Sequence, residues 1–288
     1  MRRFPPYRPF RGAAPPHFVD RPDYDDLSAA GLLQMALANY LAGPSDPRFH
    51  RLVISESHAG KTALLRHVAQ GASEDLSWVT AFHGCRPKEL VLWRVAGRLL
   101  EAVRAKWPGA ASTLPAATGA DGSWSDLRRL LESLGSFAQS MSRGLLIALD
   151  DAHLLSSAEA ECVGHLARGL ARDRLPVAFL LSGGPRLGAH YARAGYFSGT
   201  VWPAQLEGFD DAEAREALVV PAVERGVEFD EEALAIACAE AGGDPLRLQR
   251  VGFVSWTAAA AESRITAGDV EAACWSIAQP TAGLAPGA

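Results

Sequence analysis

The chain contains few cysteines, and none has a partner at a spacing suited to metal binding. Its 288 residues include only Cys85, Cys162, Cys238 and Cys274, with no C-x-x-C pair among them. Neither a zinc site nor a disulfide framework is predicted, and buried, reduced thiols are expected. The histidines also lack the spacing that would place metal ligands on one face. This holds for His17, His50, His67, His83, His153, His165 and His190.

Long apolar runs and an excess of basic residues are absent too. No segment approaches the ~18–20 apolar residues that span a bilayer. Residues 1–11 are basic like the start of a signal peptide, but their prolines and arginines exclude the apolar stretch that must follow. The formal charge of −5, from 28 Lys+Arg against 33 Asp+Glu, disfavours a surface built chiefly for nucleic acid. We therefore expect a cytoplasmic protein without a membrane partner.

Apolar runs alternate with helical patterns between residues 23 and 206. Runs that are apolar throughout, alternating with helices, are typical of a parallel sheet covered on both faces. We therefore predict an α/β domain with a five-stranded parallel sheet sandwiched by helices. The predicted strands are Leu52–Ile54, Ser77–Phe82, Gly144–Asp151, Val177–Ser182 and Val201–Trp202, and the predicted helices are 23–42, 61–70, 88–106, 123–141 and 157–172.

The regions around this domain have a different character. Residues 1–22 are rich in proline and arginine and are predicted to form an extended arm. Residues 108–122 are of low complexity and are predicted to be a surface linker. Residues 207–279 are predicted to form a small all-helical lid domain without strands, and residues 280–288 a disordered tail. The predicted lid helices are 210–219, 230–241, 245–260 and 266–277.

A phosphate-binding loop is indicated between Leu52 and Leu65, where an apolar run, a small-residue loop and Gly60-Lys61-Thr62 open a helix. Backbone N–H groups and the helix N-terminus would wrap a phosphate, Lys61 would reach the β- and γ-phosphates, and the Thr62 hydroxyl would hold Mg²⁺. Ser55 replaces the first glycine of the pattern, and His58 replaces a further glycine found in many ATPases. The predicted phosphate contacts are Ser57, His58, Ala59, Gly60, Lys61, Thr62 and Ala63.

Two carboxylates end the apolar run Leu145–Asp151. Asp150, on a strand expected beside the phosphate-loop strand, would bind Mg²⁺ in the Walker B role. Asp151 stands where many ATPases have a glutamate that positions the attacking water. Ser182, at the end of the next strand, would orient water against the γ-phosphate, or would bond only its own turn. Two solvated acids at a strand end are the alternative, and they are common. The order of phosphate loop, intervening strand, apolar run ending in two aspartates and next strand is much less common by chance.

A third candidate segment is Gly242–Gln249, in the predicted lid. Pro245 at the first position of a helix is explained by structure alone. In a functional interpretation, this loop packs on the base of a nucleotide and either Arg247 or Arg250 faces phosphate. Surface charges are the alternative for both arginines, and a capping or packing role is expected for His153.

Taken together, these motifs resemble the AAA-type ATPases related to origin-recognition-complex and STAND switch proteins. The resembling segments are Pro15–Arg21, Ile54–Leu65, Ile147–Leu154, Pro176–Arg186, Ala217–Pro221, Gly226–Asp230, Gly243–Gln249 and Ile265–Val270. The resemblance implies the P-loop NTPase fold, with ATP or ADP and Mg²⁺ between a sheet domain and a lid, and with Val19 and Arg21 along the adenine. It also implies a slow conformational switch driven by hydrolysis.

The sequence departs from this family pattern at three places. Two glycines of the phosphate loop are missing, and Asp20 replaces the usual glycine before Arg21. Residues 196–201, where many relatives place an arginine that acts in trans, contain none, although Arg193 lies just upstream. The favoured function is a Mg-ATPase switch whose hydrolysis is slow or partner-dependent. The alternatives are a nucleotide-binding interaction module that barely hydrolyses and, less favoured, a DNA-associated initiator or transposition helper. A protein partner and a homo-oligomer are both compatible with the first two.

Overall fold

The computed structural model describes residues 4–9, 17–24, 27–42, 50–109, 114, 123–194, 201–202, 206–259 and 263–279. The chain forms two compact units. We call residues 20–57 and 64–206 the sheet unit, and residues 1–19, 58–63 and 207–288 the helical unit. The tail 280–288, most of the linker 108–122 and residues 195–200 lie outside the described residues, as does the side chain of Arg193.

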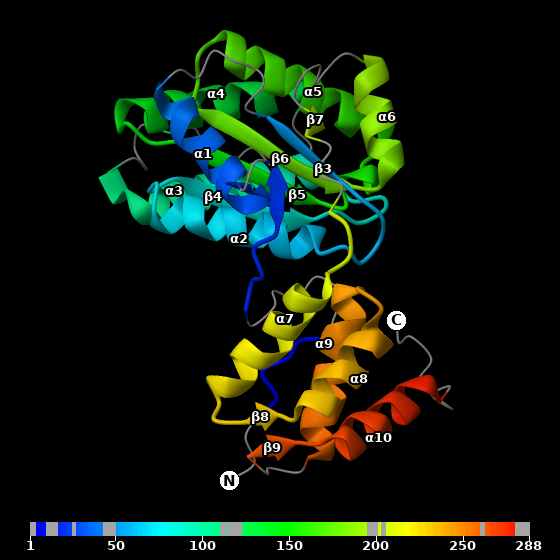
Figure 1. Cartoon of the computed structure of the whole chain (residues 1–288). Helices are drawn as coiled ribbons and strands as arrows, with labels where there is room; N and C mark the ends of the chain where they lie inside the picture. Colours follow the sequence, from blue (N-terminus) through cyan, green and yellow to red (C-terminus); the bar gives the residue numbers. More distant parts are fainter. Residues whose placement is uncertain are drawn as a thin grey trace. The chain divides into compact units, whose positions relative to one another are not determined.

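The sheet unit is built on five parallel strands (Figure 1). Their order is β4 (Val79–Gly84), β5 (Leu145–Asp150), β6 (Val177–Gly183), β3 (Arg51–Ile54) and β7 (Val201–Trp202). The predicted α/β fold with a five-stranded parallel sheet is confirmed. The expectation that the strand ending in Asp150 lies beside the phosphate-loop strand is wrong, because β6 lies between β5 and β3. Chain order gives the succession of strands but not their order in space.

Helices cover both faces of this sheet (Figure 1). They are α1 (Ala29–Ala42), α2 (Lys61–Glu74), α3 (Val91–Lys106), α4 (Trp124–Ser140), α5 (Ser157–Arg172) and α6 (Pro185–Ala194). A large core joins α3, α4 and α5 to the central strands through buried leucines and valines, with Phe179 and Tyr191 among its aromatic members. None of the helices in the described part of the chain combines the length and the apolar character needed to cross a bilayer.

Two local predictions in the sheet unit differ from the structure. The helix expected from residue 23 begins only at Ala29, after the antiparallel pair β1 (Pro22–Tyr24) and β2 (Leu27–Ser28). Aspartate and tyrosine have low helix propensity, so this start does not extend the helical pattern that follows. Helix α6 was not predicted, because Gly183-Gly184-Pro185 has the composition of a turn although proline at the first position also starts helices.

The helical unit contains α7 (Asp211–Val223), α8 (Glu231–Ala241), α9 (Pro245–Ala258) and α10 (Ala267–Ala278). The expectation of no strands in this region is wrong, because β8 (Glu228–Phe229) pairs with β9 (Arg264–Ile265). Two-residue strands have no periodicity that a sequence pattern could reveal. Helix α7 also continues through Pro221, past its predicted end at residue 219.

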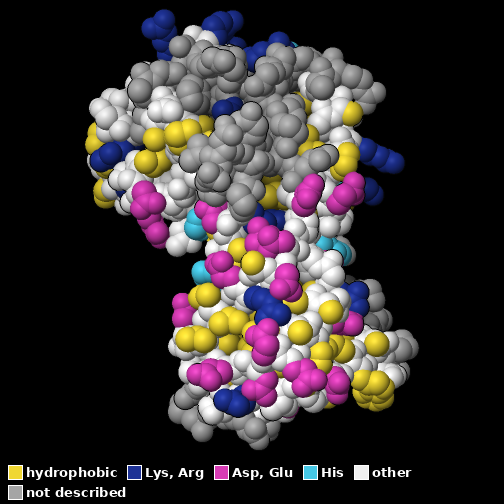
Figure 2. Space-filling model, in the orientation of Figure 1, with side chains coloured by type: hydrophobic (Ala, Val, Ile, Leu, Met, Phe, Trp, Pro, Cys, Tyr) yellow, Lys and Arg dark blue, Asp and Glu magenta, His cyan; other side chains and the backbone are white. Residues whose placement is uncertain are grey.

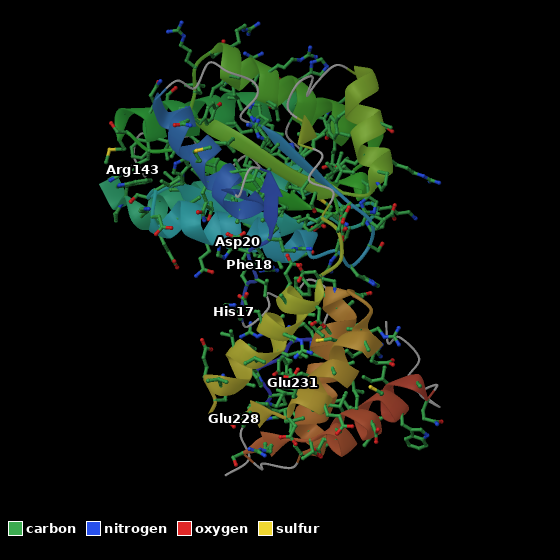
Figure 3. The ribbon with its side chains drawn as sticks, viewed as in Figure 1. His17, Phe18, Asp20, Arg143, Glu228 and Glu231 are labelled. Carbon is green, nitrogen blue, oxygen red and sulfur yellow. The ribbon has the colours of Figure 1, made fainter. Side chains whose placement is uncertain are left out.

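The N-terminal segment packs into the core of the helical unit. Tyr7 is 2% exposed, its hydroxyl donates to the carbonyl of Leu218 at 2.7 Å, and its ring packs edge-on against Trp256. A Cβ atom added to Gly252 would lie 3.0 Å from the Tyr7 ring, so glycine makes room for this ring on α9. Farther along, His17 (Figure 3) contacts Glu216 of α7 at 2.7 Å. The segment therefore contributes structural contacts to the helices.

Candidate nucleotide-binding site

The loop between β3 and α2 begins at the end of a buried strand. The Ser55 N–H donates to the carbonyl of Gly183, at 3.3 Å, and so ties the start of the loop to the end of β6. The Ser55 hydroxyl donates to the carbonyl of Glu56 at 3.1 Å. Ser55 is not among the described residues with positive φ, so it replaces glycine without backbone strain.

The second half of the loop has two residues in the left-handed region, His58 with φ 69° and Gly60 with φ 92°. Left-handed residues next to right-handed ones turn successive N–H groups toward one side and form an anion-binding concavity called a nest. Helix α2 begins at Lys61, whose side chain is only 8% exposed, and the half-buried Thr62 follows it. These residues fit a phosphate group, since N–H groups, a helix N-terminus and an ammonium meet in one segment.

The ends of β5 and β6 bring a carboxylate and a hydroxyl together. Asp150 is 4% exposed, and Ser182 is fully buried. The Ser182 hydroxyl donates to Asp150 Oδ1 and accepts from the N–H of Asp151 at 3.3 Å. Because β6 lies between β5 and β3, Ser182 is placed on the strand that separates Asp150 from the loop strand. The Asp150 carboxylate therefore has one oxygen fixed by the neighbouring strand.

Asp151 differs from Asp150 in backbone and exposure. Its φ of 52° lies in the left-handed region, which aspartate tolerates better than most residues, and its side chain is 52% exposed. His153, in the short 3₁₀ helix Ala152–Leu154, has Nδ1 4.0 Å from Asp151 Oδ1. This turn separates the two acids, leaving one buried and bonded and the other at the surface.

Cys85, just after the end of β4, contacts Asp150 at the end of the neighbouring strand β5, and the sequence analysis did not single it out. Its N–H donates to the carbonyl of Asp150 at 2.9 Å. Burial and, secondly, the charges of Asp150, Glu159, Asp151 and Glu89 raise the pKa of the Cys85 thiol to about 12. The thiol is therefore protonated at neutral pH and is not a nucleophile. Its position three residues after the predicted strand Ser77–Phe82 was the available signal.

The lid segment contacts the phosphate loop through a residue that the sequence did not single out. Asp244 precedes Pro245, the first residue of α9, and its Oδ1 accepts from the N–H groups of Leu246 at 2.8 Å and Arg247 at 3.0 Å. Its Oδ2 lies 3.1 Å from His58 Nδ1. The two residues are 186 positions apart, so no local pattern could have found this contact.

Residues 33–180 match the family model described as the AAA ATPase domain. This match covers more than half of the chain. The chain belongs to the AAA ATPase domain family. No curated protein matches this AAA domain protein in sequence. The family assignment supports nucleotide binding, and the matched residues include the loop after β3 and the end of β5.

Solved structures share the fold of this AAA protein at low sequence identity. The Aeropyrum pernix ORC2 protein, solved as ADPNP–ADP complexes, matches with a TM-score of 0.66 and 19% identity, over 93% of this chain and 70% of that one. Cdc6p from Pyrobaculum aerophilum gives 0.63 and 15%, over 90% and 68%. The Aeropyrum pernix ORC1 protein in complex with DNA gives 0.57 and 20%, over 89% and 68%. These similarities show the fold.

The other predicted site residues of the AAA protein lie in varied settings. Val19 is buried in the core of the helical unit, and Arg21 is half-buried, with its carbonyl accepting from the N–H of Ala29. Arg247 forms an ion pair with Glu240, and Arg250 is exposed. Of the two lid arginines, Arg247 thus has an acidic partner within its own unit.

Proposed function

We propose that this protein binds ATP or ADP with Mg²⁺ at the loop between β3 and α2 and acts as a nucleotide-dependent conformational switch. The observation that carries the proposal is the loop itself, with its left-handed residues and its buried Lys61 at the start of α2. The pair of Asp150 and Ser182, at the ends of β5 and β6, adds a fixed carboxylate for a metal ion. Hydrolysis is expected to be slow or partner-dependent.

Each residue has a distinct task in this proposal. Residues 57–63 hold the phosphates through their N–H groups, and Lys61 bonds the β- and γ-phosphates. Thr62 and Asp150 would hold Mg²⁺, whose charge would neutralise the charge that develops on the phosphates. Ser182 orients Asp150, and Asp151 positions the attacking water. Val19, Arg21 and Pro245 form the adenine side.

Slow hydrolysis follows from the residue that positions water. Asp151 is one methylene shorter than the glutamate found at this position in many ATPases, which leaves its oxygens roughly 1–1.5 Å short. A misplacement of that size can cost about 100-fold in rate. Half of the Asp151 side chain is also exposed to solvent, so its position is less constrained than that of the buried Asp150. A partner that closes over this turn would raise the rate.

The test of binding is thermal unfolding with increasing MgATP. At about 100 Kd of ligand, the free energy of unfolding should rise by about 2.7 kcal/mol. Lys61→Ala should abolish the increase, and Lys106→Ala, which removes an exposed lysine at the end of α3, should leave it unchanged. A rise of equal size in the Lys61→Ala variant would contradict the proposed site.

Steady-state phosphate release separates a switch that hydrolyses from a module that only binds. Turnover above the Lys61→Ala background supports the ATPase. Equal background rates, together with nucleotide-dependent stabilisation, would favour the second function, a nucleotide-binding interaction module. The left-handed, exposed Asp151 is the observation in favour of that module. Rapid turnover that Asp151→Asn abolishes would rule the module out.

A DNA-associated function is the third candidate. It draws support from the similar fold of the ORC1 protein, which was solved in complex with DNA. The net charge of −5 and the acidic side chains spread over the visible face of the helical unit (Figure 2) disfavour it. An affinity for duplex DNA that falls steeply between 50 and 200 mM salt, as about 6–10 phosphate contacts would require, would support it.

We assign the protein to the cytoplasm, with a protein partner or a homo-oligomer as the assembly to be tested.

A further inference from the structure

His58 occupies a position at which glycine would be free of strain. Its φ of 69° places a residue with a Cβ atom in the left-handed region, which glycine adopts without penalty. Histidine tolerates this region better than most residues but still needs support from its surroundings. The left-handed turn at this position is also what directs the neighbouring N–H groups into the nest. The shape of the loop therefore depends on whatever holds His58 in place.

The Asp244 carboxylate provides a support of this kind. His58 Nδ1 lies 3.1 Å from Asp244 Oδ2, and because a carboxylate can only accept, the hydrogen is on Nδ1. Both side chains are about one third exposed, which leaves room for exchange with solvent. Residues 58–63 belong to the same compact unit as residues 207–288, which agrees with this bond as a tie between the loop and the lid helices.

Asp244 is itself firmly placed. Its other oxygen, Oδ1, caps α9 by accepting two N–H groups, and the residues before it, Gly242 and Gly243, form a left-handed corner with φ of 57° and 78°. The carbonyl of Gly243 accepts from the N–H of Phe209 at 2.8 Å. The carboxylate that meets His58 is thus fixed by the corner between α8 and α9. A change at this corner would reach the loop directly.

We propose that Asp244 is a positioning residue for the phosphate loop: by bonding His58, it holds the loop in the left-handed conformation that nucleotide binding requires. The lid helices thereby stabilise a left-handed conformation at position 58 that glycine would adopt without a supporting contact. This inference rests on the proposed nucleotide binding and adds a regulatory link to it, because any partner that moves the α8–α9 corner changes the affinity for nucleotide.

A double-mutant cycle tests the link, with MgATP and MgADP affinities measured by isothermal titration calorimetry. Asp244→Ser keeps a good N-cap residue but cannot extend a second oxygen to His58. It should weaken MgATP binding about tenfold. His58→Gly should bind at least as tightly as the wild type, and the double variant should bind like His58→Gly. Rescue by glycine is an outcome that loss of the helix cap alone cannot produce.

Two further variants keep the cycle interpretable. Asp210→Ser changes the N-cap of α7, which accepts from the N–H of Glu213 at 2.8 Å, and it should leave nucleotide affinity unchanged. Asp244→Asn preserves the length and the cap but removes the charge, and it replaces the serine variant if that one fails to fold. It should weaken binding less than tenfold, and again only when His58 is present.

The outcomes separate the two proposals. If Asp244→Ser weakens binding equally with His58 and with Gly at position 58, the effect passes through the helix and the positioning role is wrong, while nucleotide binding stands. If Asp244→Ser has no effect in either background, the positioning role is wrong as well. If the wild type binds neither nucleotide, the proposed function itself fails, and the positioning role fails with it.

Discussion

The sheet unit and the helical unit are held by cores of different composition. The core of the sheet unit consists mainly of leucine and valine, with Trp93, Phe179 and Tyr191. The core of the helical unit is rich in alanine, with buried members Ala214, Ala217, Ala222, Ala233, Ala237, Ala241 and Ala259. Burial stabilises by about 0.8 kcal/mol per CH₂ group, so an alanine contributes much less than a leucine.

This difference shows why the N-terminal segment belongs to the helical unit. Small side chains let helices approach closely, but they leave few large apolar groups to bury. Among the described residues, Tyr7 and Trp256 are the buried aromatic members of the helical core, with Phe209, Phe229 and Phe253 packed against it, and Tyr7 comes from outside the helices. The segment around Tyr7 therefore supplies a substantial part of the burial on which the helices depend.

Of the substitutions considered, removal of the Tyr7 side chain should cause the largest difference in stability between the helical unit and the sheet unit. Tyr7→Ala loses a buried ring and the hydrogen bond to Leu218, and should destabilise the helical unit by about 3–5 kcal/mol. Amide hydrogen exchange read separately for α9 and α3 would show faster exchange in α9 alone. Phe4→Ala is the matched control, because Phe4 is 85% exposed, and it should stay within about 0.5 kcal/mol of the wild type. Equal losses in the two variants would contradict the role assigned to Tyr7.

Acid should weaken the sheet unit through His50. Burial is the main cause that lowers the pKa of His50 from 6.5 to about 4, with the charge of Arg51 acting in the same direction. Its Nε2 donates to the carbonyl of Ala167 at 2.9 Å, and its Nδ1 accepts from the N–H of Phe179 at 3.1 Å, so the ring is held neutral.

The sign of this effect follows from the two pKa values. Above pH 6.5, the ring is neutral in both states and the full stability is present. As the pH falls from 6.5 to 4, the unfolded chain takes up a proton that the folded chain excludes, and about 3 kcal/mol is lost. Urea unfolding between pH 7 and pH 4.5 should show a shallower pH dependence for His50→Gln than for the wild type. Parallel curves for the two proteins would show that His50 is not responsible.

The smallest expected effects on stability come from replacing one helical glycine in each unit by alanine. A Cβ atom added to Gly97 of α3 meets nothing within 4 Å, so Gly97→Ala should stabilise by roughly 0.5–1 kcal/mol through helix propensity. At Gly252 of α9, a Cβ atom would lie 2.9 Å from the Leu218 side chain and 3.0 Å from Tyr7. Overpacking there should cancel the gain and destabilise by about 1 kcal/mol. Opposite shifts in melting temperature would check the pair, and a stabilising Gly252→Ala would show that the core is loosely packed.

Long apolar runs made the sheet predictable, and short or ambiguous segments did not. The strands β3, β5 and β6 are mostly apolar because helices cover both faces of the sheet, and such runs are visible in sequence. The pairs β1–β2 and β8–β9 are too short for periodicity. The order of strands depends on how crossover helices pack. That order decided which residue, Ser182, lies next to Asp150.

The candidate site was predictable where the chemistry is local. Gly60-Lys61-Thr62 and the acids after β5 are recognised by residue type and spacing. The partner of His58 comes from a helix cap far along the chain, and the backbone angle at position 58 is not encoded by residue type alone. Contacts of this sort arise from tertiary packing, which no window of sequence contains.

The backbone at Asp151 limits how the proposed hydrolysis of ATP could be made faster. Glutamate would extend the carboxylate by one carbon, but glutamate is not among the residues that favour the left-handed conformation, whereas aspartate and asparagine are. Asp151→Glu would thus trade reach for conformational strain at φ 52°. A gain in turnover would require a change in the conformation of the turn Asp151–Leu154 as well as in the side chain. The residue type at position 151 and the backbone conformation of this turn therefore depend on each other.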